Sequence, residues 1–282
     1  MITIRIKGGL GNQMFQYAVA RAVTEKGNQD LALDISWFQA QHKREFHLGD
    51  LNVLGEVVNL STWQRLIYSS NFLQFIISQE RTYVEEQKEF SFDPSVFPAS
   101  GNTLLEGYWQ HPRYFSGVEE IIRKEFTLKK DFGAEGKSIK RQIKNSQSVS
   151  VHLRRGDYVK DDKVRRVHGA CSPDYYRRAV ELLKQKILSP HFFVFSDDIE
   201  WVKKNLSLDG EISYVSRPKL KDTEELILMS HCKHNIIANS TFSWWAAWLN
   251  ENNEKLVIAP REWFNTSEQS VQGLIPNSWK RI

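Results

Sequence analysis

The sequence of 282 residues has few of the features that mark specialised protein classes. Its two cysteines, Cys171 and Cys232, are too few for a disulfide framework, and we expect both to be reduced thiols. Charged or amide residues interrupt every long apolar stretch, and MITIRIKGGLGNQ at the start holds no apolar run of signal-peptide or membrane-helix length. We therefore expect a cytoplasmic protein without a transmembrane segment. Peripheral association with the inner face of a membrane stays open.

Long basic runs and metal-ligand clusters are also missing. The net charge is +4, yet the basic residues form only short pairs such as Arg165-Arg166 and Arg177-Arg178, which does not favour a nucleic-acid partner. His231 and His234 are three residues apart without a third ligand nearby, so we expect no metal site there. A modest positive charge also suits a small anionic substrate.

The first half of the chain begins with a strand, a glycine-rich turn, a helix and a second strand. Residues 2–7 alternate apolar and polar side chains, GGLG at 8–11 interrupts them, and a helical pattern then runs to a C-cap at Gly27. Further elements are expected at 30–35 (strand), 61–80 (amphipathic helix) and 102–109 (strand). Residues 126–147 are rich in Lys, Gly, Ser and Asn and are interpreted as a linker. The predicted domains are 1–146 and 147–282.

The second half alternates strands and helices more regularly. Strands are expected at 148–153, 191–196, 211–215, 235–238 and 255–260, with helices between them. The first of these helices should begin at Ser172-Pro173-Asp174, with Ser172 as N-cap and Pro173 at the first helical position. This alternation predicts an α/β protein with parallel sheets and Rossmann-like units.

Polar residues follow four of these strands directly. They are Arg154-Arg155-Gly156-Asp157, Asp197-Asp198, the stretch 239–243 (NSTFS) that opens a helix, and GGLGNQ at 8–13. Ligands of open α/β sheets bind beyond the carboxyl ends of the strands. Three of these groups belong to one domain and should meet at one edge of its sheet, while the fourth belongs to the other domain.

The chemistry of these groups favours a nucleoside-diphosphate pocket. A guanidinium binds phosphate through two parallel hydrogen bonds, and a helix N-terminus offers free N–H groups to an anion. Simpler interpretations remain: the arginines could form a surface pair, and Asp197-Asp198 could cap the next helix. Trp244, Trp245 and Trp248 have helical spacing and are expected to pack in the core.

Six blocks of the chain resemble the bacterial α-1,2-fucosyltransferases of glycosyltransferase family 11. They are GGLGNQMFQYA (8–18), GYWQHPRYF (107–115), VHLRRGDYV (151–159), HGACSPDYYRRA (168–179), FFVFSDD (192–198) and IIANSTFSWWAAWLN (236–250). The resemblance implies a GT-B fold, in which two Rossmann-like domains face each other across a cleft. It also implies GDP-β-L-fucose as donor, inversion at the anomeric carbon and no metal cofactor. The absence of any Asp-X-Asp triplet agrees with the last point.

The resemblance also assigns roles. Arg154 is expected to bind the β-phosphate, His152 and Asp157 to position it or contact the nucleoside, Arg155 to brace the loop, and Asp197 to contact guanine. The implied donor site comprises Gly11, Asn12, His152, Arg154, Arg155, Asp157, Ser196, Asp197, Asn239, Ser240, Thr241, Phe242 and Ser243. Arg154, Asn12, His152 and Asp157 are the implied catalytic residues. Asn12 could orient a substrate, whereas His152 and Asp157 are candidates for the general base.

The expected acceptor is a terminal β-galactoside of an oligosaccharide or glycolipid, fucosylated on its 2-hydroxyl during surface-glycan or O-antigen synthesis. Acceptor contacts are expected from Trp37, Gln39, His42, Trp109 and Gln110. Three alternatives remain open. They are a fucosyltransferase of another linkage, a Rossmann-fold oxidoreductase that uses Asp34 after its second strand, and a non-catalytic carbohydrate-binding module suggested by the nine tryptophans.

Overall fold

The computed structural model describes residues 1–282 except 41–43, 71–72, 74–80, 217–218, 266–270 and 272, and it leaves out the side chains at 157, 160, 163 and 164. The chain divides into two compact units. Unit 1 is Met1–Lys129 with Gln272–Leu274, and unit 2 is Lys130–Val271 with Ile275–Ile282. The division falls inside the predicted linker, although that linker contains helix α6 (Ala134–Lys144), which belongs to unit 2.

Unit 1 is built on a parallel five-stranded sheet in the order β3-β2-β1-β5-β4. The strands are β1 (Ile2–Arg5), β2 (Leu31–Asp34), β3 (Glu56–Val58), β4 (Thr82–Glu85) and β5 (Thr103–Glu106). The helical segments are α1 (Leu10–Gly27), α2 (Ser36–Gln39), η1 (Leu48–Asp50), α3 (Thr62–Ser69), η2 (Pro94–Val96), η3 (Pro112–Phe115) and α5 (Glu119–Glu125). Strands β3 and β4 were not predicted from the sequence.

Helix α1 is the central packing element of unit 1. Phe15 and Tyr17 are fully buried, and their rings lie 6.2 and 5.5 Å from those of Phe115 and Phe126. The helix ends one residue later than predicted, because Asn28 and not Gly27 is the left-handed C-cap, with φ of 46°. The helix predicted for residues 61–80 is wrong in extent, since α3 ends at Ser69 and most of the remainder lies outside the described residues.

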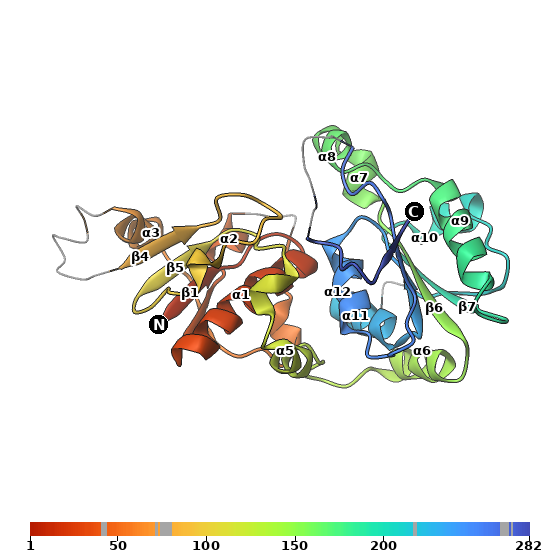
Figure 1. Cartoon of the computed structure of the whole chain (residues 1–282), viewed down its shortest axis with the longest axis horizontal. Helices are drawn as coiled ribbons and strands as arrows, with labels where there is room; N and C mark the ends of the chain where they lie inside the picture. Colours follow the sequence, from red (N-terminus) through yellow and green to blue (C-terminus); the bar gives the residue numbers. More distant parts are fainter. Residues whose placement is uncertain (41–43, 71–72, 74–80, 217–218, 266–270, 272) are drawn as a thin grey trace. The chain divides into compact units, whose positions relative to one another are not determined.

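Unit 2 is built on a parallel six-stranded sheet in the order β11-β10-β9-β6-β7-β8. The strands are β6 (Ser148–Leu153), β7 (His191–Ser196), β8 (Glu211–Tyr214), β9 (His234–Ile236), β10 (Val257–Ala259) and β11 (Lys280–Arg281). Besides α6, the helices are α7 (Gly156–Lys160), α8 (Asp162–Val167), α9 (Pro173–Lys184), α10 (Ile199–Asn205), α11 (Asp222–His231) and α12 (Thr241–Leu249). Figure 1 shows α9 and α10 on one face of this sheet and α11 and α12 on the other.

The core of unit 2 explains why its strands were predictable. Every residue of β6 and β7 is buried, as expected for a parallel sheet covered on both faces. Trp244 and Trp245 are 0% exposed, which confirms that these tryptophans of α12 pack in the core. Ser172 is the N-cap of α9 as predicted, because its Oγ accepts a hydrogen bond from the Tyr175 N–H at 3.3 Å.

Candidate active site

The strand order of unit 2 places the residues predicted to bind the donor at a topological switch point. From the adjacent strands β6 and β9, the chain proceeds outward in opposite directions, to β7 and β8 on one side and to β10 and β11 on the other. The loops after β6 and β9 therefore diverge and leave the position where open α/β sheets bind their ligands. Arg154 follows β6, and Asn239 and helix α12 follow β9.

Asp197, at the end of β7, holds the loop after β6 by two contacts. Its Oδ2 lies 2.9 Å from Nη1 of Arg154, and its Oδ1 accepts a hydrogen bond from the backbone N–H of Arg155 at 2.8 Å. Gly156 permits this approach, since a Cβ there would lie 2.6 Å from Asp197 Oδ2. The carboxylate thus fixes the position of the Arg154 guanidinium. The side chain of Asp157 lies outside the described part of the structure.

The Asp198 side chain caps the helix that follows β7, and Arg155 packs beside it. Asp198 is the N-cap of α10 and accepts a hydrogen bond from the Trp201 N–H, so the cap interpretation does not apply to Asp197. The Arg155 guanidinium lies 3.3 Å from the Trp201 ring centroid, and its Nε lies 3.5 Å from Asp198 Oδ2. Arg155 therefore braces the loop. Ser196 closes the turn, because its Oγ accepts the Asp198 N–H at 3.1 Å.

His152 is a buried, neutral imidazole beside the Arg154–Asp197 pair. It is 5% exposed, and its ring lies 5.4 Å from that of Phe242 at the start of α12. Burial lowers the pKa of His152 to about 3; the nearby Asp197 raises this pKa and Arg154 lowers it further. Its buried Nδ1 has no hydrogen-bond partner among the described residues. A neutral histidine with so low a pKa is a weak proton acceptor at neutral pH.

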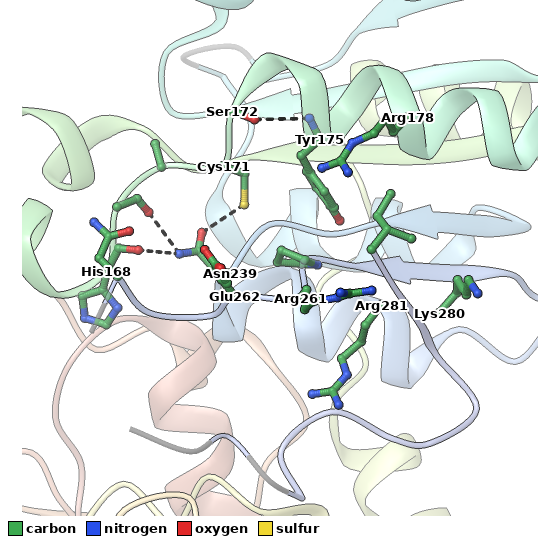
Figure 2. A pocket seen from close by; sticks show the side chains of 15 residues that line it. His168, Cys171, Ser172, Tyr175, Arg178, Asn239, Arg261, Glu262, Lys280 and Arg281 are labelled. Atoms are coloured by element: carbon green, nitrogen blue, oxygen red, sulfur yellow. Dashed lines mark hydrogen bonds between the residues drawn. The ribbon is translucent and has the colours of Figure 1, made fainter. Parts of the chain in front are cut away.

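The Asn239 side chain holds other parts of unit 2 in place. Its Nδ2 donates hydrogen bonds to the carbonyl oxygens of His168, Gly169 and Trp263 at 2.9 to 3.0 Å, and its Oδ1 accepts one from the Cys171 thiol at 3.4 Å (Figure 2). The amide thus fixes the segment that precedes α9. It was predicted to contact the donor, but all its hydrogen-bonding groups have partners within the protein.

The first turn of α12 presents fewer hydroxyl groups than its sequence suggests. Ser243 is 1% exposed, and its Oγ donates to the carbonyl oxygens of Ser240 and Ala238 at 3.3 and 3.5 Å. Ser240 is the N-cap and makes no side-chain capping bond, while Thr241 and Phe242 are partly exposed. The first N–H groups of a helix have no intrahelical acceptor, so this nine-residue helix offers backbone donors beside β6.

Three tyrosines that the sequence interpretation had left unassigned hold the strand ends together. Tyr176 donates a hydrogen bond to the carbonyl oxygen of His152 at 3.1 Å, and Tyr175 donates to the carbonyls of Ile237 and Ile258. Both come from α9. Tyr158 of α7 donates to the Asn239 carbonyl at 3.1 Å, which joins the loops after β6 and β9. The tyrosine pair stands in the block HGACSPDYYRRA, but its targets are far away in sequence.

Unit 1 has a comparable arrangement at its own switch point, between β1 and β5. Asn12, in the first turn of α1, accepts a hydrogen bond through Oδ1 from Nε2 of Gln110 at 3.1 Å. Gln13 and Gln16 hold the surrounding loops through bonds to Gly8, Glu45, His47, Lys7 and Gly107. Gly11 is buried in the same turn. The structure therefore brings together Asn12 and Gln110, which were predicted for donor and acceptor respectively.

The segment that carries Gln110 is held by a carboxylate that sequence analysis missed. Oε2 of Glu86 accepts the N–H groups of Tyr108 and Trp109 at 2.7 and 3.0 Å, while its buried Oε1 has no partner among the described residues. Burial raises the pKa of Glu86, and the two backbone N–H groups oppose that rise. Gly107 is needed here, since a Cβ on it would lie 2.4 Å from the Glu86 Cβ.

The other predicted acceptor residues occupy different surroundings. Trp109 is 1% exposed and packs edge-on against Tyr114, so its ring belongs to the core of unit 1. Trp37 is partly buried, and Gln39 is exposed and bonded to Asn59. His42 lies outside the described residues.

The oxidoreductase alternative can be compared with the geometry. An oxidoreductase would need the carboxylate of Asp34 to bind a ribose, but this carboxylate is 0% exposed and accepts hydrogen bonds from Ser36 and the Leu60 N–H.

Within the described ranges there is no group of three or more His, Cys, Asp or Glu side chains that could hold a metal ion. None of the described helices has the length and apolarity needed to cross a membrane.

Comparisons with known proteins agree with this arrangement. Residues 1–282 match the sequence family described as glycosyl transferase family 11. The chain belongs to this family. The chain is 34% identical to an alpha-1,2-colitosyltransferase of Escherichia coli, and the alignment covers 100% of this chain and 99% of that protein. It is 26% identical to human galactoside alpha-(1,2)-fucosyltransferase 1, over 88% of this chain and 65% of the human protein.

A solved structure supports the fold alone. A mutant of Arabidopsis thaliana FUT1 in complex with GDP superimposes with a TM-score of 0.52 at 13% identity, covering 91% of this chain and 69% of that one. Together with the two parallel sheets, this likeness confirms the expected α/β fold of GT-B type with two Rossmann-like units. The activity class follows from the family match instead: as a member of family 11, the chain is a glycosyltransferase.

Proposed function

We propose that this glycosyltransferase moves L-fucose from GDP-β-L-fucose to the 2-hydroxyl of a terminal β-galactoside, in an α-1,2 linkage with inversion. The observation that carries the proposal is the Arg154 guanidinium, which Asp197 holds at the carboxyl end of β6, next to the strand β9 that leads into α12. This arrangement supports binding of a diphosphate, because guanidinium and helix N–H groups are both suited to phosphate oxygens.

The proposed reaction is a single displacement. The oxygen of the acceptor 2-hydroxyl forms a bond to C1 of fucose while the bond from C1 to the GDP oxygen breaks. Negative charge then develops on the diphosphate, where Arg154 stabilises it; one well-placed donor of this kind contributes about 3–4 kcal/mol to catalysis. The hydroxyl proton leaves late, to the departing diphosphate or to solvent.

His152 has a different role in this proposal from that of general base. Its low pKa keeps it neutral, so it neither takes up the acceptor proton readily nor adds a positive charge. Its Nδ1, which has no partner among the side chains and backbone groups that the structure describes, is suited to a hydrogen bond with the donor. Asn12, bonded to Gln110, orients a substrate hydroxyl through its amide, which cannot act as a base.

The proposed donor is GDP-fucose, and GDP-colitose is the alternative that the relatives suggest. The relatives include a colitosyltransferase and fucosyltransferases, and both kinds are named as α-1,2 enzymes. Colitose is fucose without its 3-hydroxyl, and a site built to bind that hydroxyl rejects the deoxy sugar strongly, whereas an apolar site does not. Metal independence and a cytoplasmic location also remain predictions.

A donor and acceptor screen tests the proposal. Purified protein is incubated with GDP-fucose, GDP-colitose or UDP-galactose, each with lactose or N-acetyllactosamine, and the linkage of any product is determined by NMR. Fucose on the galactose 2-hydroxyl supports the proposal. Transfer from GDP-colitose alone would correct the donor, and another linkage would correct the acceptor position. An Arg154→Ala preparation is the control against contaminating activity.

A further inference from the structure

Unit 2 contains a cavity whose described wall includes neither Arg154 nor Asp197. It has a volume of about 560 Å³ and lies beside the N-terminal part of α9 and the ends of β10 and β11 (Figure 2). His152, Arg154 and Asp197 are absent from the described residues of its wall, while Asn239 contributes its side chain. A cavity of this size is in the range of small-molecule sites.

Four cationic side chains from three parts of the fold line this cavity. Arg178 comes from α9, Arg261 from the segment after β10, and Lys280 and Arg281 from β11. In the described part of the chain none of these four side chains forms an ion pair. The adjacent Arg177, by contrast, pairs with Asp174 at 2.5 Å.

The remaining wall adds little negative charge. Glu262 is the one acidic side chain in the described wall, which leaves a net side-chain charge of about three positive units. The Cys171 thiol stays protonated, because burial raises its pKa to about 11. The Tyr175 hydroxyl is occupied by the carbonyls of Ile237 and Ile258.

Hydrogen bonds hold the backbone of two parts of the wall, while the four cationic side chains are exposed. Asn239 fixes the segment 168–171 through its bonds to His168, Gly169 and Cys171. The N–H of Arg261 donates to the Ile282 carbonyl at 2.8 Å, which joins the segment after β10 to the end of β11. Such pre-organisation reduces the conformational entropy that a ligand must offset.

We propose that this cavity is a second anion site, which takes a phosphate or diphosphate ester joined to a group of about the size of a sugar. Three guanidinium forks and an ammonium suit phosphate oxygens, and the net positive charge of these side chains suits an anion with two or more negative charges. The volume exceeds that of a phosphate alone, so part of the ligand is uncharged. The site is separate from the diphosphate site proposed at Arg154 and does not depend on it.

Calorimetry with inorganic pyrophosphate tests this site in the full chain at low salt. The titration uses the Arg154→Ala variant, so that the other proposed phosphate site does not contribute. We expect binding to persist in this variant and to weaken at least tenfold when Arg281→Glu or Arg261→Glu is added. Arg177→Glu, an exposed change of equal charge on α9 outside the cavity, should alter affinity less than twofold. Thermal melts check that each variant folds, and wild-type protein with the same second substitutions repeats the comparison.

The outcomes separate the two proposals. Absence of pyrophosphate binding to Arg154→Ala, or binding that both cavity substitutions leave unchanged, would overturn the second site. Unchanged GDP binding in Arg154→Ala would instead contradict the proposed donor site.

Vesicles of phosphatidylglycerol and phosphatidylcholine distinguish the source of the phosphate. Binding to vesicles that pyrophosphate displaces identifies a lipid headgroup as the ligand, and pyrophosphate binding without vesicle binding identifies a soluble ester; both support the site. A third outcome would overturn the cavity as the site. If Arg281→Glu abolishes vesicle binding but pyrophosphate does not displace the vesicles, the lipid binds a flat basic surface and not the cavity.

Discussion

Replacement of Arg154 by lysine tests the proposed phosphate contact most directly. Nη1 of Arg154 is 2.9 Å from Asp197 Oδ2, so the guanidinium can keep this ion pair while it directs other N–H groups to a phosphate. A lysine has one nitrogen and cannot reproduce both contacts in the same geometry. We expect a loss of about 3 kcal/mol in transition-state stabilisation, which corresponds to about a 150-fold fall in kcat/KM.

The assay compares kcat/KM for GDP-fucose in Arg154→Lys, Arg155→Lys and wild type. Arg155 lies on the Trp201 ring and beside Asp198, so its replacement should lower the free energy of unfolding by about 0.5–1 kcal/mol and reduce kcat/KM far less. Circular dichroism and thermal melts show whether each variant is folded. A folded Arg154→Lys enzyme with kcat/KM within threefold of wild type would refute the assignment of the β-phosphate contact.

Three further predictions concern other parts of the two units. Gly156→Ala should displace the Asp197 carboxylate and weaken GDP binding about tenfold, measured by calorimetry, and unchanged affinity would mean that Asp197 does not position the site. Glu86→Ala should lower the free energy of unfolding by about 1–3 kcal/mol because it leaves two backbone N–H groups without an acceptor, whereas Glu86→Gln keeps the acceptor and should be at least as stable as wild type at pH 7. The pKa of Glu86 is raised in the folded state, so the wild-type protein gains stability as pH falls towards the ordinary pKa of 4.5. The difference in free energy of unfolding between Glu86→Gln and wild type should therefore shrink at lower pH. Denaturant melts that show the same difference at every pH would contradict this. Activity should persist in saturating EDTA, and a loss that Mn²⁺ or Mg²⁺ restores would exclude a metal-independent reaction.

The central strands could be predicted from the sequence because burial shows in their composition. In β7 four apolar residues stand together at 192–195, and in β6 Val149, Val151 and Leu153 alternate with polar residues; all residues of both strands are buried. The edge strands β3, β4 and β11 escaped prediction because they are two to four residues long and mostly exposed or half-buried. Helix α6 was hidden because its polar composition resembles a linker, although Ile143 is buried on one side.

The site was predictable as a set of strand ends but not as a set of contacts. The position of Arg154 after a buried strand indicated its location, yet its pairing with Asp197 joins residues of different strands and depends on the glycine between Arg155 and Asp157. Hydroxyl and amide groups at Ser243 and Asn239 were expected to face a ligand, but the structure satisfies them internally. No local sequence pattern contains that information.

The hydroxyl groups of Tyr175 and Tyr176 have a consequence for how this part of the protein can change. Tyr176 ties the start of α9 to the carbonyl of His152, the position from which the chain leaves β6, and Tyr175 ties it to the ends of β9 and β10. The intervening stretch, from Gly156 to the residue before Ser172, is therefore anchored at both ends independently of its own length. The start of α9 and the strand ends thus keep their spacing through two hydroxyl groups, neither of which belongs to α7 or α8.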